Sequence, residues 1–366
     1  MANFEGLRDS NTRQQVASVA TDRMRRGDFS AAGRAIYDPA SRVFTTDASG
    51  NVRAVSATPF PGGVIPQNRF DPVAAKLLQF YPAPTTPGDN ILRNYTRQAY
   101  TPTNWDQFTQ RIDFNENAKS FWFGRFGWND EYTSTASLFA NQNEQYALKA
   151  YQAMISNIRT FTPTMVNEFR FGFNQLNSDA TTSSAYVRNV TAELGMRDIY
   201  NTSPAAWGIP SVSLANGLSG FGDPVDAPFL EHNTTFQWTD NLSITKGSHS
   251  LKFGGEIRRM RVNELGNIYN RSNQVYNGNA TFNPASRLNT GYSFADAMLG
   301  QMSTFNWAGA LASVQFRSTP YSLYGEDVWK VTPRLTVNVG LRYRSEEHTS
   351  ELQSLAYLVC RLLLEK

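Results

Sequence analysis

The stretch NEFRFGFNQ, residues 167–175, alternates apolar and polar side chains and decides the fold class. Its three phenylalanines fall on one face of an extended strand, and the residues between and after them fall on the opposite face: Glu168, Arg170, Gly172 and Asn174. In a soluble sheet the phenylalanines would face a protein core, whereas in a membrane barrel they would face lipid. The stretch alone predicts a strand with one apolar face and leaves its environment open.

Three more segments repeat this period of two. RLTVNVGLRY, residues 334–343, places its leucines, valines and tyrosine on one face, and SLKFGGEI, residues 250–257, does the same with its leucine, phenylalanine and isoleucine. SFWFGRFGWN, residues 120–129, is less regular but keeps Trp122 and Trp128 on one side. The chain is rich in aromatic residues (13%) and poor in charged ones (18%), which suits strands that alternate between lipid and lumen.

The connections between the predicted strands alternate between short and long. Short turns are predicted at residues 115–119, 162–164, 246–249 and 332–334, and long connections at about 130–145, 178–233 and 263–317. Soluble domains seldom contain loops beyond about 15 residues, whereas outer-membrane barrels have short periplasmic turns on one rim and long extracellular loops on the other. The sequence therefore predicts an all-β fold, a partial antiparallel transmembrane β-barrel of about 9–10 strands.

The N-terminal third has a different composition. Residues 10–102 are rich in proline and are predicted to form one long surface loop. A short helix is expected within it over residues 71–81, because Asp71 suits the N-cap, Pro72 suits the first turn and Pro82 ends the helix.

Composition and charge exclude several function classes. The 34 Lys and Arg against 31 Asp and Glu residues give a net charge of +3 spread along the chain, so nucleic acid is not an expected partner. The single cysteine, Cys360, and the two histidines predicted in turn and loop positions, His232 and His249, form no constellation for catalysis or metal binding. We therefore expect no catalytic residues, no metal and no cofactor, and we expect that the protein is not an enzyme.

The sequence also bounds how the protein meets a membrane. No apolar run of about 18 residues exists, so no transmembrane helix is predicted. The N-terminal residues MANFEGLRDS lack the basic and apolar regions of a signal peptide. A barrel needs such a signal to reach the outer membrane, so we expect a longer parent protein of which this chain is a piece.

Two sets of residues are candidate functional positions. Charged residues on the polar faces of predicted strands are candidates to line the lumen, where they would contact a plug or a solute path: Arg125, Glu168, Arg170, Glu256 and Arg342. Tryptophans near predicted strand ends are candidates for the aromatic girdle at the membrane interface: Trp105, Trp122, Trp128, Trp238 and Trp329. The alternatives are that the charges only pair structurally and that the tryptophans belong to a soluble core.

Several motifs resemble one family in the expected order. YSLYGEDVWKVTPRLTVNVGLRY, residues 321–343, resembles the aromatic, Asp-Trp, Pro and "GLRY" signature of TonB-dependent outer-membrane receptors, and NTTFQWTDNLSITKGSHSLKFGGEIRR, residues 233–259, resembles a hairpin of that family. GDFSAAGRAIYDPAS and FPGGVIPQNRFDPVAAKLLQFYPAP resemble segments of its Oar-like branch, which carries a carboxypeptidase-regulatory-like N-terminal domain. The resemblance covers residues 3–343.

The resemblance implies a barrel of about 22 strands with a plugged lumen. It also implies a parent protein in the outer membrane of a Gram-negative-type bacterium, in contact with outer-membrane lipid. That protein would be energised by the partner TonB through an absent N-terminal region and would take up a bulky solute: an oligosaccharide, a peptide or a metal chelate. A passive porin or surface adhesin on a similar barrel is the first alternative, and a secreted soluble glycan-binding β-protein is the second.

The last segment, RSEEHTSELQSLAYLVCRLLLEK, breaks the alternation of the strand before it. It can be read as an amphipathic helix, but its two ends can also be back-translated to the two ends of a common sequencing adapter, in one frame. We expect residues 344–366 to be a non-native tail, residues 1–343 to be the N-terminal part of a barrel, and the chain as written to be unable to close that barrel.

Overall fold

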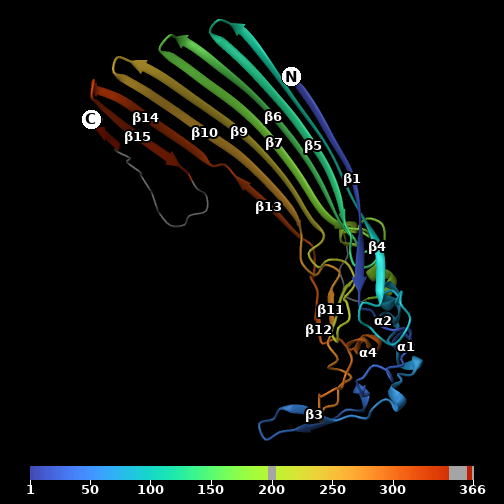
Figure 1. The fold of residues 1–366 in the computed structure, drawn as a ribbon. Helices are drawn as coiled ribbons and strands as arrows, with labels where there is room; N and C mark the ends of the chain where they lie inside the picture. The colour runs from blue at the N-terminus through green and yellow to red at the C-terminus, as the bar shows by residue number, and fades with distance from the viewer. Residues whose placement is uncertain (197–202, 346–360, 365–366) are drawn as a thin grey trace.

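The structure is a computed structural model that describes residues 1–196, 203–345 and 361–364. It consists of a curved antiparallel sheet with packed loops at one end (Figure 1). Along the described chain the sheet runs in the order β1-β4-β5-β6-β7-β9-β10-β14-β15-β16, with β13 also paired to β10. The strands are β1 (Ala2–Ala17), β4 (Tyr95–Asn117), β5 (Ser120–Thr135), β6 (Glu144–Thr162), β7 (Met165–Thr182), β9 (Phe229–Lys246), β10 (His249–Gly266), β13 (Ala312–Ser318), β14 (Tyr321–Thr332), β15 (Leu335–Arg344) and β16 (Arg361–Leu364).

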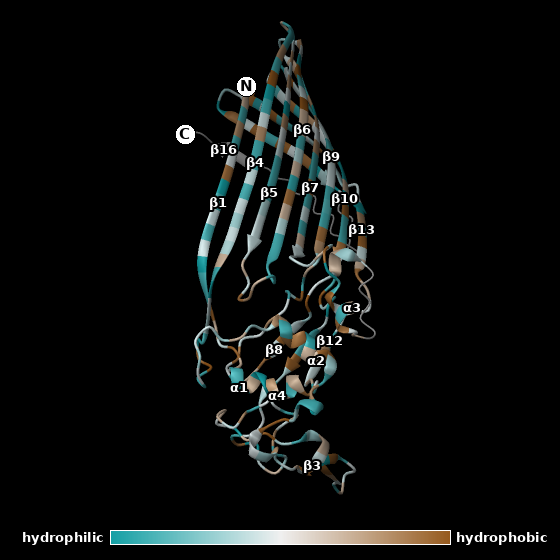
Figure 2. Ribbon diagram, turned by 90° about the vertical axis from the view of Figure 1, so that its right-hand side faces the viewer, coloured by the Kyte–Doolittle hydropathy of each residue, from teal (hydrophilic) through white to brown (hydrophobic). Residues whose placement is uncertain are grey.

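The predicted all-β class and antiparallel layout are confirmed, and the sheet is open rather than closed into a barrel. Figure 2 shows apolar and polar residues alternating along the strands. No helix of the described residues is long and apolar enough to span a membrane.

All four predicted short turns join neighbouring strands at the end of the sheet opposite the packed loops (Figure 1). The turn after β9 contains only residues 247 and 248. Gly247 has φ +60°, the left-handed conformation that glycine adopts without steric cost and that a two-residue hairpin turn needs.

The strands are longer than the sequence predicts. Ser10 pairs with Pro102 inside the β1–β4 ladder, so the prediction of one loop over residues 10–102 is wrong at both ends, and the segment between these strands covers residues 18–94. The other long connections shrink to residues 136–143, 183–228 and 267–311. Backbone ladder hydrogen bonds need no apolar side chains, so pairing continues where the apolar alternation stops.

The predicted helix over residues 71–81 is shorter than expected but has the expected cap. It consists of α2 (Pro72–Leu77) followed by a 3₁₀ turn at Leu78–Phe80. The Asp71 carboxylate accepts hydrogen bonds from the backbone N–H groups of Val73 (3.0 Å) and Ala74 (2.8 Å). The other α-helices are α1 (Asp22–Arg25), α3 (Val190–Leu194) and α4 (Ser293–Met298).

The four long connections pack together into one body, which we call the cap: the described residues of 18–94, 136–143, 183–228 and 267–311. At its centre the fully buried ring of Tyr81 lies 5.5 Å from Phe139, 5.0 Å from Phe221 and 5.8 Å from Phe294. Each of these four residues comes from a different connection, so apolar residues in all four connections remove one another from water.

Two small sheets complete the cap. β8 (Ser211–Leu214), β11 (Asn273–Tyr276) and β12 (Thr304–Asn306) form one, and β2 (Val43–Thr46) and β3 (Val52–Ser56) form a hairpin at the end farthest from the large sheet (Figure 1). Of the predicted non-native tail, residues 346–360 and 365–366 lie outside the described residues. The backbone of β16 pairs with β15.

Candidate functional site

All five predicted lumen residues share one face of the large sheet, the charged face. Residues directly opposite each other in an antiparallel ladder point to the same side. Arg170 is linked through Thr239 to Glu256, and Arg125 through Met154 to Gly172, two residues beyond Arg170. Glu168 and Arg342 belong to this face as well, joined through the partners Asn241, Gly254 and Tyr324.

Several of these charges pair along their own strands. The guanidinium of Arg170 donates to the carboxylate of Glu168 (2.9 Å from Nε to Oε1), and Glu256 forms an ion pair with Arg258. The charged face therefore carries acidic and basic groups side by side.

The opposite side is the apolar face, and no described part of the chain covers it. The ring centroids of Phe171 and Trp238 lie 5.5 Å apart, and those of Phe173 and Phe236 lie 5.3 Å apart; both pairs are tilted. Large side chains on this face stay exposed, with Phe253 at 46%, Ile257 at 50%, Leu323 at 59% and Leu341 at 57%. So extended an exposed apolar surface is unstable in water, which argues against the soluble alternative.

The predicted tryptophan girdle is only partly supported by position. Trp122 and Trp329 lie close to the short turns on the apolar face, as expected. Trp128 and Trp238 share that face but lie in the middle of β5 and β9, because these strands extend past the apolar alternation. Trp105 pairs with Glu131 on the charged face, which does not fit a place among lipid-facing aromatics.

The two histidines of the described residues, His232 and His249, lie in strands rather than in a turn or loop, and each has a carboxylate partner. His249 Nδ1 is 2.7 Å from Asp327 Oδ2, and its ring stacks on Trp329 with centroids 5.2 Å apart. His232 Nε2 is 3.0 Å from Asp179 Oδ1. Among the described residues no cluster of histidine, cysteine and acidic side chains is arranged to hold a metal.

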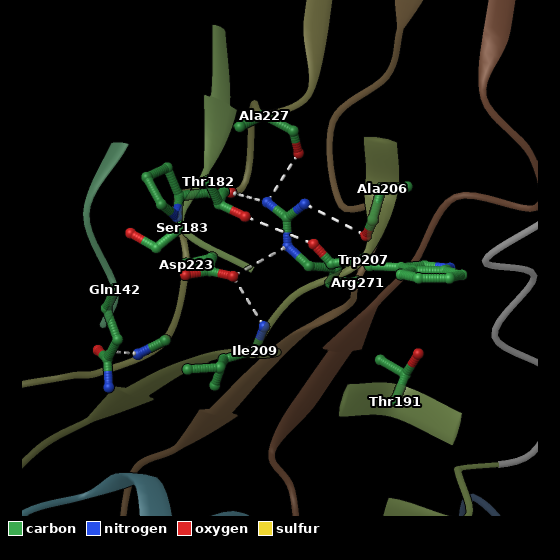
Figure 3. Close-up of polar contacts among 12 residues, drawn as sticks. Gln142, Thr182, Ser183, Thr191, Ala206, Trp207, Ile209, Asp223, Ala227 and Arg271 are labelled. Atoms are coloured by element: carbon green, nitrogen blue, oxygen red, sulfur yellow. Dashed lines mark hydrogen bonds and ion pairs between the residues drawn. The ribbon is translucent and has the colours of Figure 1, made fainter. Parts of the chain in front are cut away.

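A buried ion pair holds the cap together (Figure 3). The guanidinium of Arg271, 3% exposed, donates to the carbonyl oxygens of Pro224 (2.6 Å), Ala227 (2.7 Å) and Ala206 (3.4 Å). Its Nε lies 3.8 Å from Oδ2 of Asp223, which also accepts from the N–H of Ile209 at 2.8 Å. Arg271 thus joins the connection after β10 to three points of the connection after β7.

Burial raises the pKa of Asp223 to about 6, and the charge of Arg271 opposes that rise. An acid whose folded pKa lies above its unfolded value binds its proton more tightly in the folded state. The folded cap therefore gains stability from this group as the pH falls through about 6 toward the ordinary value of 3.8.

We therefore predict that Asp223→Asn changes the pH dependence of cap stability. Between pH 7 and pH 4 the stability of the wild-type cap should rise relative to that of the variant, because only the wild type takes up this proton. Hydrogen exchange of residues 203–228, measured in both proteins across that range, checks the prediction. Parallel pH profiles would contradict it.

A cleft of about 350 Å³ lies where the cap meets β5 and β6, and polar and apolar groups line it about equally. Hydroxyl, amide and carboxylate groups line it, among them Thr135, Gln142, Glu144, Ser213 and Asp223. Gln142 fixes one wall, because its side chain accepts from the N–H of Gly222 (2.8 Å) and donates to the carbonyl of Phe80 (3.1 Å).

Sequence reasoning missed the cap, its ion pair and the cleft. Arg271 and Asp223 lie in irregular segments, where no periodicity marks a residue as buried, and their contacts join positions far apart in the chain. The cluster of aromatic residues in the long connections was the available signal, since long mobile loops do not need such residues.

Comparison with known proteins gives a family and several distant structures, one of which is an outer membrane transporter. A family model described as "Outer membrane beta barrel domain" matches residues 1–356. No curated protein sequence matches. The fold resembles the outer membrane transporter YddB from Escherichia coli with 9% identity and a TM-score of 0.41; the match covers 72% of this chain and 29% of the transporter chain.

Proposed function

The chain belongs to the outer membrane beta barrel domain family, and from that membership we propose that its parent protein is a TonB-dependent transporter of the Oar-like branch, which takes up a bulky polar solute. One observation supports the proposal. The large sheet has one charged and one apolar face, and its long connections all lie at one end, where they pack into the cap. Such a cap can select a solute before the charged face conducts it. The chain has no catalytic part in this proposal.

The open sheet fits a part of a larger barrel. The outer edge of β1 has no partner strand in the described chain, and lipid cannot satisfy the hydrogen-bonding groups of a free edge. The proposal therefore requires further strands to close the barrel, together with a plug that meets the charged face and contacts TonB.

A passive porin is the second candidate, because ion pairs along a strand also line open channels. Planar-bilayer recordings of the full-length protein distinguish the two. A plugged transporter should give no steady conductance and should bind the purified periplasmic domain of TonB. Steady open-channel currents without TonB binding would establish the porin instead.

A further inference from the structure

Two arginines, Arg34 and Arg42, bind the two ends of one segment of the cap, residues 278–291. Arg42 donates through Nη2 to the carbonyl oxygens of Asn279 (2.6 Å) and Ala280 (2.7 Å). Arg34 donates to the carbonyl oxygens of Gly291 (2.9 Å) and Thr290 (3.0 Å). The two ends of this segment are therefore fixed by guanidinium groups from the connection between β1 and β4.

The ring of Phe282, within that segment, forms cation–π contacts with two arginines. The guanidinium carbon of Arg42 lies 4.9 Å from the ring centroid, and that of Arg287 lies 4.4 Å from it. The two cations cannot be farther apart than the sum of those distances. Each gains from the ring, but their mutual repulsion is a cost that an anion between them would remove.

Neither cation has a carboxylate partner among the described residues. The side chain of Arg287 is exposed and forms no hydrogen bond or ion pair there, and the Nε of Arg42 is buried without a hydrogen-bond partner. The nearby carboxylates are already occupied. Asp296 accepts from the N–H groups of Ala280 and Thr281 and from the Thr281 hydroxyl (3.0, 2.9 and 2.7 Å), and Asp38 binds Arg69 with two contacts of 2.8 Å.

We propose that Arg42, Phe282 and Arg287 form a binding site for a compact anionic group: a phosphate, a sulfate or a carboxylate. Arg287 supplies a whole guanidinium fork, the group best suited to bidentate binding of such anions. Arg42 supplies a second positive charge at the same ring, and the Phe282 ring holds both cations in place. The site lies near the β2–β3 hairpin and does not rest on the transport proposal.

The experiment is a titration of the full-length protein in a non-ionic detergent at low ionic strength, with inorganic phosphate alone and, separately, with dextran sulfate. Calorimetry should show binding to the wild type and about tenfold weaker binding to Arg287→Gln, the loss of one charge-assisted contact. Arg53→Gln, on the exposed β3 strand of the same hairpin, is the matched control and should bind as the wild type does. Arg287 donates to no other group of the described chain, so its removal should leave the fold intact.

The two probes distinguish the sources of the anion. Phosphate binding that depends on Arg287 identifies a small free anion as sufficient, and Arg287-dependent binding of dextran sulfate alone identifies a charged polysaccharide; either supports the site. The inference is overturned if the wild type binds neither probe, if Arg287→Gln binds as tightly as the wild type, or if Arg53→Gln weakens binding equally.

Discussion

Phe171→Arg is expected to prevent assembly of the full-length protein into the outer membrane. Phe171 is the seventh residue of β7 and lies on the apolar face, where its ring packs against that of Trp238. An arginine facing lipid near the bilayer centre costs about 2–4 kcal/mol, and loss of the aromatic pair adds about 1 kcal/mol. The amount of protein that fractionates with outer membranes and runs as a heat-modifiable species should fall sharply.

Gly172→Arg is the matched control, because it adds the same charge one residue along on the charged face. A side chain has room there, since the nearest heavy atom to an added Cβ is Gln237 Cβ at 3.9 Å. This variant should assemble as the wild type does. Normal assembly of Phe171→Arg, or equal damage from Gly172→Arg, would show that the apolar face does not meet lipid.

The faces of the strands could be predicted because the period of two is a local property. Phe169, Phe171 and Phe173 set the side of their own strand, and one strand fixes its neighbours through the ladder. The same rule shows where the prediction for Trp105 went wrong: within β4 it stands an odd number of residues from Phe108, so the two must point to opposite sides.

Strand ends were less predictable than strand faces. The polar residues Thr12–Gln15 of β1 pair with Arg97–Tyr100 of β4 as regularly as the more apolar residues of these strands do. Nothing in their composition marks them as strand, since above a membrane both faces of a ladder can be hydrated. The helix at Asp71 was predictable for the opposite reason, because a cap and a proline act within a few residues.

The cap could not be predicted because its contacts are long-range. Tyr81 packs on Phe139, Phe221 and Phe294, and the polar residues that join the same connections carry no pattern of their own. A buried arginine such as Arg271 reads in the sequence as an ordinary exposed loop residue. The structure therefore gives Arg271 a part in the stability of the cap that its place in the sequence does not indicate.

Arg271→Met should unfold the cap locally while the sheet remains assembled. It leaves three carbonyl oxygens without their donor and the carboxylate of Asp223 without its cation, all inside the cap. Removing one partner of a buried ion pair costs about 3–5 kcal/mol, enough to raise hydrogen exchange of residues 203–228 by two orders of magnitude or more. Exchange measured by mass spectrometry on the full-length protein, with the ladder of β6 and β7 as internal reference, checks this.

Two further variants show whether the ion pair or the bulk of the side chain is responsible. Arg53→Met removes an exposed arginine of the same cap and should leave exchange unchanged. Adding Asp223→Asn to Arg271→Met removes the orphaned charge and should recover part of the loss, because an unpaired buried carboxylate costs more than an unpaired amide. If Arg271→Met exchanges like Arg53→Met, the contacts of Arg271 do not hold the cap together, and its stability must come from the aromatic cluster around Tyr81 alone.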